Sequence, residues 1–378
     1  MEAAFYGRRF SAQWREEMKT TVLVVGAGPA GSCTAREIAR AGLDVLAIDR
    51  REEIGFPVQC GEFIPIADEL RRILPGSEAY GDLFEIPPGI VERETRYIDL
   101  YGPRGSSFSI KFNGLTVDRR RFDKEIWRRA EKEGARLSTG VEFQGLENSG
   151  SANTSAGKIG FDVIVGADGP LSRVRRALSL DAPKSISQAI TAQAAGDWGD
   201  RVSMYFGPVA PGGYAWIIPK RETANVGLGV QKVMSSLPLT ELLRLFQEKH
   251  DIECGETTYG QVPISGPIKK TVRGNGLLVG DAAGQVMATN GGGIPIAMIC
   301  GRIAGRCISS ALRGGPDLGA YETEWRRQVY RPLRNAARTK AIADRFLSGD
   351  LRLELAMKML RSRGLERAIL CKRLFYLF

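Results

Sequence analysis

The segment Thr20–Gly31, TTVLVVGAGPAG, constrains the fold of this chain more than any other stretch. Within it, Val22–Val25 is a short, wholly apolar run, as expected for a parallel strand that is buried on both faces. Glycines in G-x-G-x-x-G spacing follow at once, then a helical segment that ends at Gly42 and a second apolar strand that ends at Asp49. A chance glycine-rich turn would lack these other parts, so the order predicts a β-α-β unit that binds a dinucleotide.

Each glycine of this motif has a distinct expected role. Gly26 permits the tight turn, Gly28 lets a pyrophosphate approach the backbone, and Gly31 lets helix and strand pack closely. The phosphates are expected at the helix N-terminus, where free N–H groups and the helix dipole favour anions. Asp49, 21 residues after Gly28, is placed to bind a ribose hydroxyl. The predicted cofactor site at this end of the chain also includes Ala30 and Arg50.

Composition limits the other kinds of chemistry. The 378 residues are enough for two or three packed units, and no apolar run is long enough to span a bilayer. The six cysteines show no C-x-x-C pair and no metal-ligand spacing, so we expect reduced thiols, a cytoplasmic protein and no metal site. The single histidine, His250, argues against a histidine-based triad and indicates that a cofactor carries the chemistry. Residues 1–19 are polar and are predicted to be a disordered extension.

Positive charge is concentrated near the C-terminus. From Arg331 onward the chain has 12 Lys and Arg against 4 Asp and Glu, which accounts for most of the net charge of +10. This segment is predicted to form helices that are broken near Pro332, Gly349 and Gly364. Such a basic segment favours an anionic partner, either a membrane surface or an acidic protein, over a nucleic acid.

These basic helices also have a predicted apolar side, formed by Leu351, Leu355, Met359, Leu365 and Ile369. The chain ends in LFYLF at residues 374–378, and aromatic residues suit a bilayer interface. We therefore expect peripheral association with a membrane. The alternative is a helical cover that buries its apolar side on the protein's own sheet.

Three motifs at strand ends then occur in one order: GAGPAG at 26–31, GADGPLSRVR at 166–175 and GLLVGDAAG at 276–284. Singly, each is compatible with an ordinary turn. Together they resemble the FAD-dependent reductases and hydroxylases of the p-hydroxybenzoate hydroxylase type. The resemblance implies that the first motif binds the ADP half of FAD. It places Asp168 and Gly169 by the pyrophosphate, and Gly280 and Asp281 by the ribityl chain.

Further elements of this group extend the implied FAD site. A D-R-x-x-F-D motif stands at 118–123 and makes Arg119 a flavin-chain contact. Val141 is the position of a backbone contact near adenine. A helix follows Asn290, and its N-terminus is expected to stabilise the reduced flavin near its pyrimidine ring. The residues implied there are Gly292, Gly293 and Ile294.

Two stretches narrow the resemblance: PVQCGE at 57–62 and PGGYAWIIPK at 211–220. They resemble the C-G-E loop and the Y-x-W-x-F-P signature of the geranylgeranyl reductase family, and most of all its archaeal digeranylgeranylglycerophospholipid reductases. The likeness runs from Thr21 to Ala311. Ile218 replaces the usual Phe of the signature, which alters the expected pocket shape. Asp49 replaces the usual Glu after the second strand.

The resemblance implies a FAD-dependent reductase that saturates isoprenoid double bonds of a membrane phospholipid precursor by flavin hydride transfer. Cys60 and Glu62 are the implied catalytic residues, and Cys60 and Gly61 also contact the flavin. Whether Cys60 donates a proton, gates the site or only contacts FAD stays open. In a strand, Tyr214, Trp216 and Ile218 share one face and form either a substrate pocket or simply core.

Two other functions are considered. The first is an aromatic or polyketide hydroxylase, or a halogenase, that uses the same flavin frame with O₂. The second is a flavin-binding or membrane-surface protein without turnover. No second G-x-G-x-x-G follows a strand, so the electron donor is expected to be a ferredoxin or a transiently bound NAD(P)H.

The fold class is therefore predicted as α/β, α+β overall. It comprises a Rossmann-like FAD-binding domain, an inserted antiparallel-sheet catalytic domain that binds the substrate, and a C-terminal helical segment. The predicted boundaries are 20–82, 113–182 and 270–315 for the FAD-binding domain, 83–112 and 183–269 for the catalytic domain, and 316–378 for the helical segment.

Overall fold

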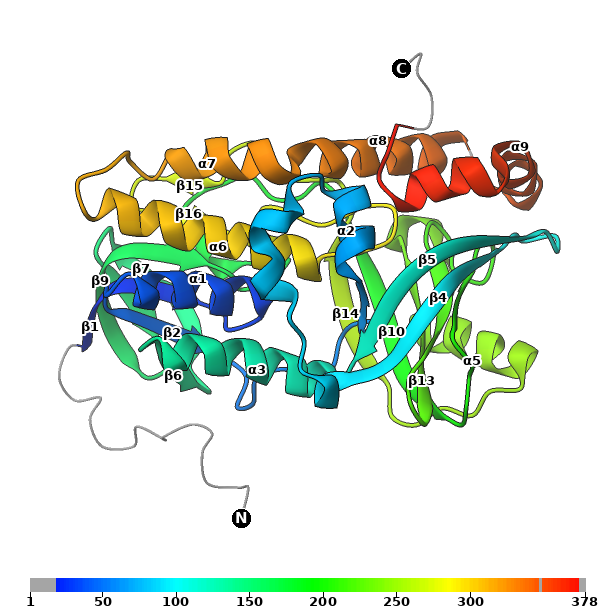
Figure 1. Cartoon of the computed structure of the whole chain (residues 1–378), viewed down its shortest axis with the longest axis horizontal. Coiled ribbons are helices and arrows are strands. Elements are labelled where there is room, and N and C mark those ends of the chain that lie inside the picture. Colours follow the sequence, from blue (N-terminus) through cyan, green and yellow to red (C-terminus); the bar gives the residue numbers. More distant parts are fainter. Residues whose placement is uncertain (1–17, 347–348, 374–378) are drawn as a thin grey trace.

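The computed structural model describes residues 18–346 and 349–373, and within them the strands form two eight-stranded sheets. The sheets lie next to each other along the long axis of the molecule, and the C-terminal helices extend across both (Figure 1). This arrangement is the predicted α/β fold with a second sheet and a helical segment. The predictions for residues 1–17 and 374–378 lie outside the described residues. Met18 and Lys19 are strand residues, not part of an extension.

The first sheet is the Rossmann-like one. Its path is β15-β16-β9-β1-β2-β6, and β8 joins it through β9 and carries β7. The pairs from β16 to β6 along this path are parallel, so their carboxyl ends share one edge, where α/β proteins bind ligands. The strand bounds are β1 Met18–Val25, β2 Val45–Asp49, β6 Arg136–Thr139, β7 Phe143–Asn148, β8 Ser151–Thr154, β9 Gly157–Gly166, β15 Val272–Arg273 and β16 Gly276–Leu278.

Helices α1, α3, α4 and α6 belong to this unit, with bounds Pro29–Arg40, Arg119–Lys132, Arg173–Ala177 and Ile294–Ala311. Helix α6 crosses α1 at very short range. A Cβ atom on Gly301 would lie 2.3 Å from the carbonyl oxygen of Ala30, and one on Gly305 would lie 2.7 Å from that of Thr34. Only glycine permits this contact between backbones. Helix α6 is also long and apolar enough to cross a bilayer, but 78% of it is buried inside the protein, as in a core helix.

The second sheet follows the order β14-β10-β13-β12-β11-β4-β5-β3. Within the described ranges its pairs are antiparallel except β11 with β4, which is parallel, so the predicted antiparallel sheet contains one parallel junction. Strand β3 and the end of β5 lie in ranges predicted for the first domain, and the domain boundaries stay a prediction. The bounds are β3 Phe63–Pro65, β4 Val91–Tyr101, β5 Ser107–Val117, β10 Ile186–Ala195, β11 Arg201–Tyr205, β12 Tyr214–Pro219, β13 Thr223–Val230 and β14 Thr258–Pro263.

Short helices connect these parts. Helix α5, Leu239–His250, buries Leu242, Leu243 and Phe246 against the second sheet. The ring of its last residue, His250, packs against Tyr205 and Phe246 at centroid distances of 4.6 and 4.7 Å. The other short elements are α2 Ala67–Ile73 and the 3₁₀ helices η1 Ser77–Phe84, η2 Pro88–Ile90, η3 Lys232–Met234 and η4 Gly280–Ala283.

The C-terminal segment is more continuous than the sequence suggested. Helix α7, Ala320–Trp325, runs through the π-helical turn η5, Arg326–Tyr330, into α8, Arg331–Phe346, and α9 covers Asp350–Ile369. Pro332 is the second residue after the π-helical turn, where the regular α-helical hydrogen-bond pattern is already interrupted. The break expected at Gly364 instead lies at Arg361, whose φ is +52°.

The predicted apolar side of α9 divides into two parts. Leu365 and Ile369 are buried in the core. Leu351, Leu355 and Met359 are 51–83% exposed and recur every four residues along one side of the helix. The second half of α9 is therefore a cover, as one alternative predicted, and the first half presents an apolar stripe to the surface. Contact of this stripe with a membrane stays a prediction.

Candidate active site

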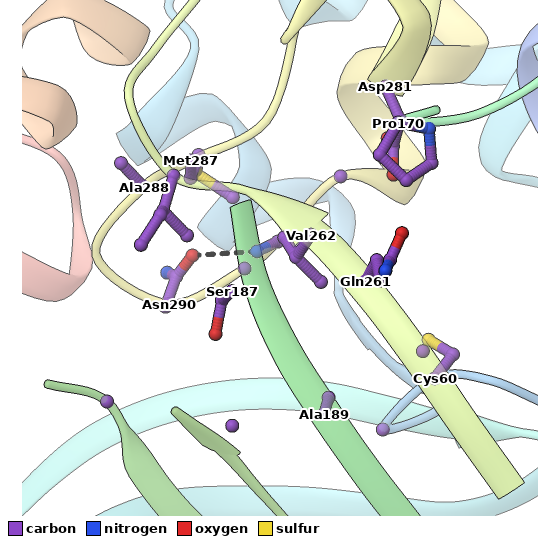
Figure 2. Close-up of a pocket in the computed structure, with 18 of the residues that line it drawn as sticks. Cys60, Pro170, Ser187, Ala189, Gln261, Val262, Asp281, Met287, Ala288 and Asn290 are labelled. Carbon is purple, nitrogen blue, oxygen red and sulfur yellow. Dashed lines mark hydrogen bonds between the residues drawn. The ribbon is translucent and has the colours of Figure 1, made fainter. Parts of the chain in front are cut away.

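A cavity of about 1890 Å³ runs from the carboxyl edge of the first sheet, past the second sheet, to α8 and α9. A pocket for one small ligand measures roughly 300–1000 Å³, so this cavity has room for two. The labelled residues of Figure 2 come from β10, β14, the loop of Cys60, the turn of Pro170 after β9 and the segments around Asp281 and Asn290. These parts are far apart in the sequence, and the cavity is where they meet.

Nearly all predicted site residues line this cavity. The two that do not are Gly31 and Gly280, both in the described part of the chain. A Cβ atom on Gly31 would lie 1.8 Å from the carbonyl oxygen of Gly26, so Gly31 serves packing, as its motif role predicts. Gly280 begins the η4 turn with φ +63°, and its N–H donates to the side chain of Gln285. Gly280 thus has a role in the turn, and its contact with the cofactor stays a prediction.

Gly28 and the start of α1 form a phosphate cradle. Gly28 is the N-cap of α1, with no side-chain cap and no acidic residue in the first turn among the described residues. The first N–H groups of the helix are therefore open to an anion. A Cβ atom on Gly28 would meet no described atom within 4 Å, so space for a pyrophosphate exists in front of it. Gly26 has φ +101°, and a Cβ atom there would lie 2.3 Å from the carbonyl oxygen of Ala167.

Asp49 lies at the end of β2 beside this cradle. One carboxylate oxygen accepts a 2.8 Å hydrogen bond from the N–H of Ala27, and the other accepts one of 2.9 Å from the N–H of Arg51. These bonds fix the carboxylate against the glycine turn. Each oxygen retains a further lone pair, which is what two ribose hydroxyls require.

The hydrogen bonds of Asp168 stabilise the local fold at the start of α4. Its carboxylate accepts hydrogen bonds from the Ser172 hydroxyl and from the N–H groups of Arg173 and Val174, so it caps the start of α4. Burial raises the pKa of Asp168, and these hydrogen bonds oppose that effect. The next residue, Gly169, has φ +79° and faces the cavity, so here the backbone and not the carboxylate is placed for a ligand.

Asp281 and Arg119 are two of the charged residues that line the cavity. Burial raises the pKa of Asp281 to about 6, although the positive charge of Arg119 opposes this. The guanidinium of Arg119 makes a bidentate pair with Asp123 at 3.1 and 2.8 Å and also contacts the thiol of Cys60. Burial favours the neutral form of Arg119, but Asp123 and Cys60 outweigh it and hold the pKa of Arg119 above its usual range.

Cys60 lies in the loop before β3, beside this guanidinium. Its sulfur also accepts a 3.2 Å hydrogen bond from the N–H of Glu62. Tyr214 is close enough for its pKa to be raised by Cys60 in addition to burial, which is the larger cause. The Tyr214 hydroxyl donates a 2.5 Å hydrogen bond to the carbonyl oxygen of Asn290. A thiol and a phenol therefore lie together at the junction of the two sheets.

The aromatic wall predicted from the sequence is present on β12. Tyr214, Trp216 and Ile218 all line the cavity, and the rings of Tyr214 and Trp216 are 5.8 Å apart. Two glycines make room for them: a Cβ atom on Gly227 would lie 2.5 Å from the Trp216 indole, and one on Gly61 would lie 2.9 Å from Ile218. Contact of these three residues with a substrate stays a prediction.

Glu62 has more partners than a free catalytic acid would have. It is 1% exposed and has φ +61°. Its carboxylate accepts hydrogen bonds from the ammonium of Lys220, at 3.1 Å to each oxygen, and from the N–H of Arg119 at 3.2 Å. The amide groups of Gln193 and Asn225 donate to it at 2.9 and 3.0 Å.

Sequence reasoning did not identify Lys220, Gln193 and Asn225 as site residues. A signal for one of them existed, since Asn225 is the one polar residue in the otherwise apolar stretch 224–230. Gln193 and Asn225 are directly opposite each other in the register of β10 and β13, and Ile218 of β12 is the next partner of Asn225. Within the described residues no group of three or more His, Cys, Asp or Glu side chains is arranged to hold a metal ion.

Comparison with known proteins identifies the family. The model of the geranylgeranyl reductase catalytic domain matches residues 185–260, and that of an NAD(P)-binding Rossmann-like domain matches residues 24–71. The digeranylgeranylglycerophospholipid reductase of Methanocaldococcus jannaschii is 35% identical over 87% of this chain and 88% of that protein. The chain belongs to the geranylgeranyl reductase family. Reductase 1 of that name from Methanopyrus kandleri is 34% identical over 92% of this chain and 98% of that protein.

Solved structures agree with membership of the geranylgeranyl reductase family. A geranylgeranyl bacteriochlorophyll reductase-like protein from Thermoplasma acidophilum superposes with a TM-score of 0.80 at 25% identity, over 91% of this chain and 92% of that one. A flavin-dependent brominase has a TM-score of 0.70 at 18% identity, over 93% and 92%, which shows a shared fold. This chain is therefore a flavin-dependent oxidoreductase that acts on carbon–carbon double bonds.

Proposed function

We propose that this reductase binds FAD and saturates the isoprenoid chains of a digeranylgeranylglycerophospholipid, a membrane lipid precursor. One observation carries the proposal: a single cavity joins the phosphate cradle at Gly28 to the aromatic wall of β12 and the apolar side chains of α8 and α9. Its volume of about 1890 Å³ exceeds what one small ligand needs. A dinucleotide and a prenyl chain are two ligands that fit its two different ends.

The residues at the cradle end suit FAD. The open N–H groups after Gly28 would hold its pyrophosphate, and Asp49 would accept hydrogen bonds from the ribose of its adenosine half. Asp281 and Arg119 line the cavity where its ribityl chain would pass. The N-terminus of α6 has no side-chain cap among the described residues, so its N–H groups are free to face the flavin ring.

When bound and reduced, the flavin supplies a hydride to one alkene carbon. The residues of this chain orient the substrate, exclude water and supply the proton. Tyr214, Trp216 and Ile218 would orient the double bond and exclude water, since an isolated alkene offers few polar groups to hold. The second carbon needs a proton, and Cys60 is our candidate for that donor because its thiol lines the cavity. Both carboxylate oxygens of Glu62 already accept hydrogen bonds from N–H groups. We therefore propose that Glu62 acts by holding Cys60 in position.

The apolar stripe of α9 gives the lipid a route to the cavity. Met359 belongs to both the exposed stripe and the cavity lining, so the two surfaces are continuous there. Exposed Arg352 and Lys358 accompany the stripe on α9. We propose that this half of α9 contacts an anionic membrane surface, where each basic side chain contributes about 1 kcal/mol. The electron donor in this proposal is a ferredoxin or NAD(P)H that binds transiently.

Anaerobic assay of lipid reduction tests the function. The flavin-loaded enzyme is reduced with dithionite and incubated with digeranylgeranylglycerophospholipid in detergent. Mass spectrometry is expected to show products heavier by two hydrogens for each double bond reduced. Oxygen consumption with aromatic substrates, and no reduced lipid, would instead support the hydroxylase or halogenase alternative. Activity in neither assay would leave a flavin-binding protein without turnover.

A further inference from the structure

Asn225, in β13, is a polar side chain with no exposure at all, and it lies behind the wall of the cavity. Its carbonyl oxygen accepts hydrogen bonds from the Thr191 hydroxyl at 2.7 Å and from the Trp216 indole N–H at 2.8 Å. Its amide nitrogen donates to the carbonyl oxygen of Cys60 at 2.8 Å and to a carboxylate oxygen of Glu62 at 3.0 Å. Two donated and two accepted bonds are the full capacity of an amide side chain.

The chemistry of the partners fixes the orientation of this amide. The indole of Trp216 can only donate, so it must face the oxygen of Asn225. The carbonyl of Cys60 can only accept, so it must face the nitrogen. Reversing the amide would therefore break both contacts. One buried residue thus joins the aromatic wall to the backbone of the residue that carries the thiol.

The loop that Asn225 holds does not keep this shape by backbone preference alone. Glu62 has φ +61°, a conformation that non-glycine residues adopt only when their surroundings hold them there. Its backbone carbonyl accepts from the N–H of Val117, and its carboxylate is anchored by Lys220 and Gln193 as well as Asn225. Among these described anchors, Asn225 is the one that also binds Cys60 and Trp216.

We propose that Asn225 is a positioning residue that fixes the Cys60 thiol and the Trp216 ring relative to each other. The inference rests on the proposed function, in which the double bond lies between this wall and the flavin. In that arrangement Asn225 holds the backbone of Cys60 at a fixed place relative to Trp216. Arg119 and the N–H of Glu62 contact the sulfur itself. Misplacement of a reacting group by about 1 Å costs on the order of 100-fold in rate.

Asn225→Asp is the informative substitution because it removes the two hydrogen bonds that Asn225 donates and keeps the two that it accepts. The retained oxygen still accepts from Thr191 and Trp216, whereas the new oxygen faces two acceptors, the Cys60 carbonyl and the Glu62 carboxylate. The loop should be displaced and the wall left in place. The matched control is Thr191→Val, which removes one hydrogen bond of the same amide without touching the loop.

Two measurements on the flavin-loaded, full-length protein decide the matter. For Asn225→Asp we expect kcat for lipid reduction to fall about 10- to 100-fold, with flavin content and lipid KM unchanged. Backbone hydrogen exchange should be faster in the peptide that covers residues 57–63 and unchanged in β12. Thr191→Val should remain near wild type in both measurements. The exchange result does not require lipid turnover, so it separates failure of this inference from failure of the proposed function.

Three results would overturn the inference. The first is Asn225→Asp with wild-type kcat and wild-type loop exchange. The second is an equal effect of the Asp variant and Thr191→Val, which would show general weakening of the sheet. If the Asp variant does not fold, Asn225→Ala removes the same loop contacts without adding a charge, and the same readouts apply to it. The third result is failure of both variants to fold, which would assign Asn225 to fold stability instead.

Discussion

The carboxyl group of Asp281 makes the stability of the flavin-free enzyme depend on pH. Burial raises its pKa to about 6 from an ordinary value of 3.8, despite the nearby Arg119. A difference of roughly two pKa units corresponds to about 3 kcal/mol. The folded protein holds this proton more tightly than the unfolded chain, so the associated stability is present below pH 3.8 and is lost as the pH rises through about 6.

Asp281→Asn removes the ionisable group and should therefore stabilise the flavin-free protein at neutral pH. The gain has an upper limit of about 3 kcal/mol, because solvent in the cavity screens part of the penalty. With an unfolding entropy of about 2.1 cal/mol/K per residue and 378 residues, this limit corresponds to about 4 °C in Tm. At pH 4.5 the advantage should be smaller, since the wild-type carboxyl is then mostly protonated.

Thermal unfolding of flavin-stripped wild type and Asp281→Asn, followed by circular dichroism at pH 4.5 and pH 7.5, is the assay. An equal Tm difference at both pH values, or a variant that is less stable at pH 7.5, would refute the reasoning. Flavin titration gives the complementary result: we expect affinity to fall about 10- to 100-fold, because a hydrogen bond to a charged group contributes about 1.5–3 kcal/mol.

Three further predictions concern the cradle, the thiol and the C-terminal helix. Gly28→Val should fold, since its φ of −71° suits any residue, but lose its yellow colour; Gly31→Ala should fail to fold because of its backbone clash. Stoichiometric flavin in the purified Val variant would contradict the phosphate assignment. Cys60→Ser should retain flavin and reduce lipid more slowly, and unchanged turnover would make Cys60 a bystander. Co-sedimentation with anionic vesicles should weaken in high salt and in the double variant Leu351→Ser, Leu355→Ser, whereas identical binding would exclude α9 as the contact.

Features that depend on neighbouring residues could be predicted from the sequence. The strand, glycine turn, helix and second strand up to Asp49 form one local unit, and each part has its own signal. The start of α3 after Asp118 is similar, because the Asp118 carboxylate caps the N–H of Arg121 three residues later. The alternation of Tyr214 and Trp216 likewise required only that β12 be a strand.

Features that depend on distant partners could not be predicted in this way. The resemblance to the C-G-E loop implies Glu62 as a catalytic residue, but its contacts with Gln193, Lys220 and Asn225 span 131 to 163 residues. The sequence shows these as three separate polar residues and does not show that they meet at one carboxylate.

The sequence also did not show which apolar side chains of helix α9 are exposed. Leu351 and Leu365 have the same apolar character, and only tertiary packing leaves one exposed and buries the other. The parallel pairing of β4 with β11 is also a property of topology, because it joins segments about 100 residues apart.

The contact between α1 and α6 has a consequence for the relative position of the two helix N-termini. Ala30 is at the start of α1, whereas Gly301 is seven residues after the start of α6. At 1.5 Å per residue, the beginning of α6 therefore projects about 10 Å past the beginning of α1. The backbone contact fixes this offset between the N-terminus of α1 and the N-terminus of α6. Any residue larger than glycine at Gly301 would push the two backbones apart and change this offset, although Gly301 itself lies outside the cavity.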